Sequence, residues 1–298
     1  MKTLKKIGKW TGIVIGSILA LVIIVYAYIY FQTEHMINKK YAYTIPAMTI
    51  PTDSLSIARG EHLYHIRACV DCHGPDLNGK VYVNDPMLLR LTIPNITKGK
   101  GGLPADFDVK DWLRVLRHGV DKEGRSLFIM PSHESSQLSK GDLADLIAYC
   151  MSRPPVASNY EMLHEIGPIG RVVLALNKAT VLPAEKIDHN TDIREKRASG
   201  VSTSYGKYLA VTCQGCHRQN LQGGGPLAPG YPDVPNITST GEPGKWNDEL
   251  FIKTIRTGQT PEGKKLRNQY MPWKSMNNFS DEELKAIFVY LKSLPEKQ

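Results

Sequence analysis

The stretch CVDCH at residues 69–73 returns later in the chain as CQGCH at residues 213–217. In each stretch two residues separate the cysteines, and a histidine directly follows the second cysteine. Two thiols at this spacing lie on one helical turn, where they can bond the two vinyl groups of a haem while the histidine binds the iron. The pattern predicts two covalently attached c-type haems, with these attachment and iron-ligating residues: Cys69, Cys72, His73, Cys213, Cys216 and His217.

Zinc is the main competing interpretation of these cysteines. A structural zinc site takes four ligands, usually as two Cys/His pairs, so the two stretches would have to meet in space. A thioredoxin-like redox pair does not need the histidine, and no βαβ pattern surrounds either stretch. The repeated surroundings of each stretch favour haem.

The sequence around each haem motif is itself repeated, which indicates two copies of one domain. The segment IPNIT at residues 93–97 recurs as VPNIT at 234–238, and residues 112–119 have a counterpart at 251–258. Each copy ends in a stretch with apolar residues at helical spacing, preceded by a serine that fits a helix cap. We therefore predict a mainly α-helical chain.

Met130 and Met271 are the candidates for the sixth iron ligand. Each precedes a proline, and each follows its haem histidine at a similar distance. A thioether ligand raises the reduction potential and favours electron transfer over ligand chemistry. His133 could compete with Met130, but its counterpart in the second copy is Lys274, which favours a surface or rim position.

Two further pairs of residues match across the repeat. The iron-binding histidine needs an acceptor for its other ring N–H, and a backbone carbonyl in the Pro94 or Pro235 loop is well placed for this. A repeated arginine near a haem most simply pairs with a propionate carboxylate, which is the role predicted for Arg117 and Arg256. An ordinary solvated helix charge is the alternative at both positions.

The fifth cysteine, Cys150, takes the place of Leu291 on the apolar stripe of the last helix of its copy. A packed thiol is the simplest interpretation. A haem ligand, a lipid site or a disulfide partner are the alternatives, although no unpaired second cysteine exists for a disulfide.

The N-terminal region predicts a membrane anchor. No charged residue lies between Trp10 and Thr33, and about 20 apolar residues span a ~30 Å hydrocarbon core. Lysines precede this run, so the positive-inside rule places the N-terminus in the cytoplasm and the haem domains on the periplasmic side of the inner membrane. A signal peptide cleaved near Ala27 is the alternative, but the apolar run is longer than the ~7–15 residues of a signal core.

Composition sets the outer limits. The 298 residues are 42% hydrophobic, which excludes disorder as the main state. The net charge is +8, and four N-terminal lysines supply half of it, so no basic face for nucleic acid is indicated. We predict a cytoplasmic tip and transmembrane anchor (1–33), a tether (34–54), a first haem domain (55–153), a connector (154–199) and a second haem domain (200–298).

Taken together, the haem motif, Pro-Asn-Ile-Thr, Met-Pro and the serine-capped last helix resemble class I cytochrome c domains. More closely, they are similar to the cytochrome subunit of membrane-bound alcohol and gluconate dehydrogenases, over about residues 55–155 and 200–298. The resemblance implies a small helical fold around each haem, with His73/Met130 and His217/Met271 as axial pairs. In that family the proline accepts a hydrogen bond from the iron-binding histidine, and the asparagine and threonine face the haem edge, which carries over to Pro94, Asn95, Thr97, Pro235, Asn236 and Thr238.

Two departures from that family concern the partner rather than the haem chemistry. The dehydrogenase subunits usually carry three haem motifs, and this chain has two. They are typically anchored at the C-terminus, whereas the apolar run here is N-terminal.

These features predict an electron-transfer protein rather than an enzyme, because an iron with two protein ligands leaves no place for substrate. The leading hypothesis is a membrane-anchored dihaem cytochrome that relays single electrons between respiratory partners, either a dehydrogenase or a terminal oxidase or quinol-oxidising complex. One alternative is the electron-transfer subunit of a periplasmic alcohol or sugar dehydrogenase complex. A dihaem peroxidase is less favoured, since it needs an iron with an open or releasable sixth site.

Overall fold

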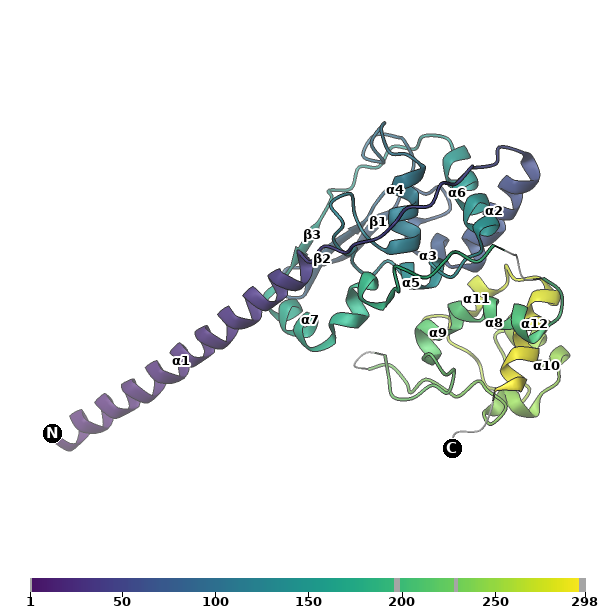
Figure 1. The fold of residues 1–298 in the computed structure, drawn as a ribbon. Helices are drawn as coiled ribbons and strands as arrows, with labels where there is room; N and C mark the ends of the chain where they lie inside the picture. The colour runs from purple at the N-terminus through teal and green to yellow at the C-terminus, as the bar shows by residue number, and fades with distance from the viewer. Residues whose placement is uncertain (1, 196–198, 228–229, 295–298) are drawn as a thin grey trace.

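The computed structural model describes residues 2–195, 199–227 and 230–294 (Figure 1). Its first element is one long helix, α1 (Lys2–Ile37), which projects away from the rest of the molecule. Within the described residues, one stretch, Lys5–Ile37, is long and apolar enough to cross a membrane, with a mean hydropathy that reaches 2.6. Its large apolar side chains from Ile7 to Val25 are exposed, whereas Met36, near the C-terminal end, is buried. Helix α1 is therefore a candidate membrane anchor.

We call the domain that contains Cys69–His73 module 1 and the domain that contains His217 module 2. Module 1 is built on two helices, α2 (Ser54–Ile66) and α6 (Lys140–Ser152), that pack against each other. Between them in sequence lie four short helical elements: α3 (Cys69–His73), α4 (Val109–Leu113), the π-helix η1 (Arg114–His118) and α5 (Ser132–Ser135).

Module 2 repeats this order. Its helices α8 (Thr203–Leu209) and α12 (Asp281–Ser293) pack together as α2 and α6 do. The elements between them are α9 (Val211–His217), the 3-10 helix η3 (Glu242–Lys245), α10 (Asp248–Thr257) and α11 (Trp273–Met276). The predicted mainly helical architecture, an apolar N-terminal helix followed by two helical domains, is confirmed.

A glycine at the same place in each module lets the paired helices approach closely. A Cβ atom at Gly60 would lie 2.0 Å from the carbonyl oxygen of Asp145, and one at Gly206 would lie 1.9 Å from that of Ala286. The backbones of α2 and α6, and of α8 and α12, are therefore in direct contact at this point. Any larger residue would force the pair apart.

The predicted serine caps begin both last helices. Ser280 and Glu283 form a complete capping box at α12. At α6, Ser139 accepts from the backbone N–H of Asp142 at 3.2 Å, which is one half of that arrangement.

Module 1 also carries an antiparallel three-stranded sheet that the sequence did not predict. Its order is β1 (Lys80–Asp85), β2 (Leu89–Ile93) and β3 (His164–Ile166), with Lys80 opposite Ile93 and Leu89 opposite Ile166. The third strand comes from the connector, which continues as α7 (Pro168–Val181) and the 3-10 helix η2 (Pro183–Lys186). The connector is thus part of the fold of module 1.

Residues 38–53 also lie on module 1. The backbone N–H of Tyr41 donates to the carbonyl of Gly124 at 3.0 Å, and the ring of Tyr43 stacks on His118 with centroids 4.7 Å apart. The buried apolar residues of both modules form one continuous cluster, which includes Leu146 of α6 and Leu291 of α12. Module 2 is therefore docked on module 1.

Candidate haem sites

Each haem-motif histidine is buried at the end of its helix and oriented by a proline carbonyl. His73 Nδ1 lies 3.1 Å from the carbonyl oxygen of Pro94, and His217 Nδ1 lies 2.9 Å from that of Pro235. This hydrogen bond fixes the proton on Nδ1 and leaves the Nε2 lone pair free for a metal. Burial lowers the pKa of both imidazoles and so favours the neutral form that binds iron. The structure thus places the predicted proline acceptor beside the predicted ligand in both modules.

The four motif cysteines are half-buried on α3 and α9. No group of three or more His, Cys, Asp or Glu side chains within the described ranges is placed to hold a metal ion. A four-ligand zinc site therefore finds no support, whereas two thiols and one histidine per helix fit haem attachment.

The loop that carries each proline is held by the same polar turn. Asn95 Oδ1 accepts from the backbone N–H and the hydroxyl of Thr97, both at 2.8 Å. Asn236 Oδ1 accepts from the same two groups of Thr238, at 2.9 Å and 2.8 Å. Both threonines are buried. These side chains fix the loop, and through it the proline carbonyl that orients the histidine; their contact with a haem edge remains a prediction.

A leucine and a glycine after each motif, not among the predicted site residues, also shape the site. Leu77 and Leu221 are fully buried with a positive φ of 60°, and Gly79 and Gly223 have φ of 72° and 67°. A Cβ atom on either glycine would lie 2.1 Å from a carbonyl oxygen of the proline loop, so only glycine permits this approach. The signal was present, because both residues recur at the same offset from the haem histidine.

The two Met-Pro segments have matching backbones. Pro131 has φ −79° and ψ 50°, and Pro272 has φ −76° and ψ 59°, and each begins a four-residue helix. The carbonyl of each methionine accepts from the backbone N–H two residues later, at 2.8 Å for Met130 and 2.7 Å for Met271. Both methionine side chains are half-buried against the core, so the fold presents the predicted sixth ligands alike in both modules.

The two repeated arginines already have protein acceptors. Arg117 donates to the carbonyls of Ser136 and Thr191. Arg256 forms an ion pair with Asp281 at 2.6 Å and donates to the carbonyls of Asn277 and Phe279. The predicted pairing with haem propionates would have to share these donors.

Two other residues of module 1 were singled out by the sequence. His133 is half-buried, its Nδ1 has no hydrogen-bond partner, and burial lowers its pKa to about 4; its predicted surface or rim position remains a prediction. Cys150 is buried in the core, and burial raises the pKa of its thiol well above the usual value. Cys150 thus occupies the packed position that the sequence predicted.

The chain segments that lead into the two candidate sites meet where the modules are in contact. Arg67, two residues before Cys69, donates to the carbonyl of Tyr208 at 3.1 Å and lies 4.8 Å from the centre of its ring. Thr212, directly before Cys213, donates to the carbonyl of Ile66 at 3.4 Å. The chain entering one attachment helix therefore contacts the chain entering the other.

Comparison with known proteins agrees with this geometry. Residues 57–154 and 204–295 each match the model of the cytochrome c family. The chain belongs to the cytochrome c family, and it is an electron-transfer protein that binds haem c covalently. The resemblance inferred from the motifs is confirmed.

Within the cytochrome c family, the chain is similar to cytochrome subunits of dehydrogenases. Over 289 residues the chain is 26% identical to "Alcohol dehydrogenase (quinone), cytochrome c subunit" of Gluconacetobacter polyoxogenes, covering 85% of this chain and 58% of the relative. It is 26% identical over 279 residues to the fructose dehydrogenase cytochrome subunit of Gluconobacter japonicus, covering 81% and 53%. It is 24% identical over 271 residues to the gluconate 2-dehydrogenase cytochrome c subunit of Pantoea cypripedii, covering 81% and 60%. The chain thus spans little more than half the length of these relatives.

Proposed function

We propose that this chain is the electron-transfer subunit of a dehydrogenase complex that oxidises an alcohol, a sugar or a sugar acid, and that it carries two haem c groups, one in each module. The observation that carries the proposal is the similarity, over more than 80% of the chain, to cytochrome subunits of three such dehydrogenases. A partner of this kind is better supported than the terminal oxidase or quinol-oxidising complex considered from the sequence, since these relatives are all dehydrogenase subunits.

In this proposal the residues divide into attachment, ligation and orientation. Cys69, Cys72, Cys213 and Cys216 hold the haems, and His73/Met130 and His217/Met271 bind the irons. Haem iron supplies one-electron redox chemistry when bound, and a sixth protein ligand excludes substrate from it. Because the chain segments entering α3 and α9 are in contact, electrons cross between the modules without a third carrier.

The proposal includes a retained membrane anchor. Helix α1 spans the inner membrane, with its N-terminal lysines in the cytoplasm and both modules in the periplasm, as the positive-inside rule favours. Support comes from the exposed apolar run of α1. The anchor confines electron delivery to the membrane surface.

A pull-down of the tagged full-length protein in mild detergent tests this function. We expect a quinoprotein or flavoprotein dehydrogenase to co-purify. We also expect ethanol, fructose or gluconate to reduce the haems of the isolated complex as fast as the dehydrogenase turns over. The same complex without substrate is the control. Recovery of oxidase or quinol-oxidising subunits alone, with no reduction by any of the three substrates, would overturn the proposal.

A further inference from the structure

Helix α7 has an apolar face that remains exposed. Ile169, Val172, Val173 and Leu176 are 48%, 36%, 44% and 76% exposed, and they recur at i, i+3, i+4 and i+7, so they form one stripe. We call this stripe the α7 apolar face. The opposite side of α7 is also apolar, because Leu174 is buried in a cluster with Met36 of α1. A helix at a water-exposed surface normally presents polar residues outward, so the stripe calls for an apolar environment.

The β1–β2 turn extends this surface. Met87 and Leu88 are 50% and 42% exposed. The carbonyl of Met87 accepts from the backbone N–H of Ile169 at 2.9 Å, and that of Leu88 accepts from Gly167 at 3.0 Å. Apolar side chains from two elements therefore lie together on one side of module 1, and contiguous exposed patches of this kind mark interaction sites.

Contacts with α1 fix the height of α7 relative to the apolar run. Arg171 of α7 donates to the hydroxyl of Thr33 at 2.8 Å, pairs with Glu34 at 2.7 Å, and lies 4.1 Å from the ring centre of Tyr30. The uncharged apolar core of α1 ends at Phe31. At 1.5 Å per residue, Thr33 and Glu34 lie about 3 to 4.5 Å beyond that end, and Tyr30 lies just inside it. A bilayer has a headgroup region of about 5 to 7 Å on each side, so α7, beside the end of α1 (Figure 1), is held at headgroup level.

We propose that the α7 apolar face, with Met87 and Leu88, is a lipid-contact surface lying in the interface of the bilayer that α1 spans. The inference rests on the membrane anchoring proposed above. The occupant is lipid rather than a protein because the surface adjoins the exposed apolar surface of α1 at the depth where that surface meets the headgroups. Interfacial helices bury their apolar face about 5–10 Å into this boundary. Module 1 is then attached to the membrane at two points, which fixes the orientation of both modules.

Site-directed spin labelling of the full-length holoprotein in phospholipid nanodiscs tests this surface. A nitroxide is placed at Leu176→Cys; Cys150 is buried, the other cysteines carry haem, and the unsubstituted protein gives the labelling background. Leu21→Cys, in the middle of α1, is the reference for the bilayer core. Leu250→Cys, an exposed apolar position on α10 of module 2, is the reference for water. Power saturation compares oxygen, which concentrates in lipid, with a water-soluble nickel chelate.

We expect the oxygen-to-nickel accessibility ratio at position 176 to exceed that at position 250 at least threefold and to stay below that at position 21. A ratio at 176 equal to that at 250, with 21 immersed in lipid, would overturn the lipid surface and leave the anchor intact. A label at 21 accessible to nickel would overturn the anchor itself. Low accessibility to both reagents at 176 would show a protein contact there and would also overturn the proposal.

Discussion

Modules 1 and 2 share the arrangement around the haem histidine and differ in the chain segments that pack over the module. Both have the histidine-to-proline-carbonyl bond, the Asn–Thr turn and the Met-Pro bend in matching geometry. Module 1 is also covered by residues 38–53, a three-stranded sheet and most of the connector. Local sequence thus determines the arrangement around each haem histidine, and the segments that cover it can differ between the modules.

The helical segment before Gly119 in module 1, compared with the one before Gly258 in module 2, shows the effect of these covering segments. Residues 108–119 and 247–258 have equal length, yet the second forms one regular helix, α10, and the first is divided into α4 and the π-helix η1. The π-helical part ends at His118, which stacks on Tyr43 and lies 3.2 Å, nitrogen to nitrogen, from His189. Both partners come from covering segments, so tertiary contacts override the local helical preference here.

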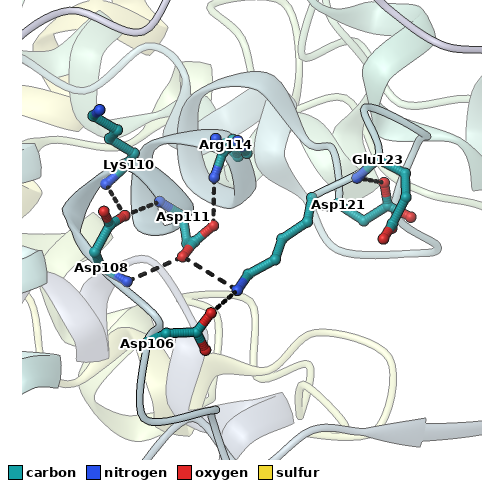
Figure 2. Close-up of polar contacts among 8 residues, drawn as sticks. Asp106, Asp108, Lys110, Asp111, Arg114, Asp121 and Glu123 are labelled. Carbon is teal, nitrogen blue, oxygen red and sulfur yellow. Dashed lines mark hydrogen bonds and ion pairs between the residues drawn. The ribbon is translucent and has the colours of Figure 1, made fainter.

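Figure 2 shows how the start of that helix is nevertheless fixed. Asp108 accepts from the backbone N–H groups of Lys110 and Asp111 at 2.8 Å and 3.1 Å, and Asp111 accepts from the backbone N–H of Asp108 at 3.0 Å. Asp111 also pairs with Arg114. Because the backbone N–H groups at the start of the helix have acceptors, the N-terminal half keeps its α-helical form. The C-terminal half is the part that changes to a π-helix.

The largest expected effect tests whether the modules are equivalent as haem carriers. Replacing Cys213 and Cys216 with Ala should remove one of two haems, and replacing Cys69 and Cys72 should remove the other, because each thioether pair holds one haem. Haem content by pyridine haemochrome and intact mass measures this. Cys150→Ala is the matched control and should leave both. Retention of two haems in either double variant would contradict the assignment.

The next effect separates the two sixth ligands. Met271→Ala and Met130→Ala should each lower the potential of one haem and make its reduced form bind carbon monoxide, since a thioether ligand raises the potential. Met276→Ala, in α11 but without a counterpart in module 1, should change neither property. An unchanged potential and spectrum in Met271→Ala would remove that residue from the ligand set. A six-coordinate product in Met130→Ala alone would instead point to His133 as a replacement ligand in module 1.

The sequence predicted the residues around each haem motif but not the segments that cover module 1, and the reason is physical. Haem attachment requires fixed residue types at fixed spacing, so Cys69, Cys72, His73 and their counterparts are visible without a structure. The third strand was missed because β3 pairs with β2 across more than 70 residues of sequence, a long-range contact that local patterns do not reveal. In the connector, Leu163 is buried, whereas Ile169, Val173 and Leu176 are exposed; apolar residues at helical spacing do not by themselves show which side of a helix faces the core.

A smaller effect is expected from the glycines that bring the paired helices together. Gly60→Ala and Gly206→Ala should each destabilise the holoprotein by about 1–3 kcal/mol, because the new methyl group meets a backbone carbonyl. Denaturant unfolding of the full-length protein measures the free energy. Gly225→Ala, where the added Cβ meets nothing within 4 Å, is the control. A neutral result at Gly206 and a large one at Gly60 would show that the modules do not share this helix contact.

The smallest effect concerns the ion pair between the modules, His62 with Glu283 at 2.8 Å. The hydrogen bond to Glu283 raises the pKa of His62 above its ordinary value of 6.5. The pair therefore stabilises the protein fully below pH 6.5, and this contribution is lost as the pH rises through the raised pKa. The pair is partly exposed, so we expect roughly 0.2–1 kcal/mol.

Unfolding free energies measured from pH 6 to pH 9 test this. The protein should lose this stability on alkalinisation, and His62→Gln should lack that part of the pH dependence. A double-mutant cycle with Glu283→Gln isolates the pair from the helix cap that Glu283 also forms at α12. Identical pH profiles with and without His62 would show that the pair does not hold the modules together.

The central claim is that each module holds one haem with histidine and methionine as axial ligands. Spectroelectrochemical titration of the full-length protein, with carbon monoxide added at the reduced end, tests it most directly. We expect each protein to take up two electrons and to form no carbon monoxide adduct. Uptake of one electron per protein, or a haem that binds carbon monoxide in the unsubstituted protein, would contradict the claim.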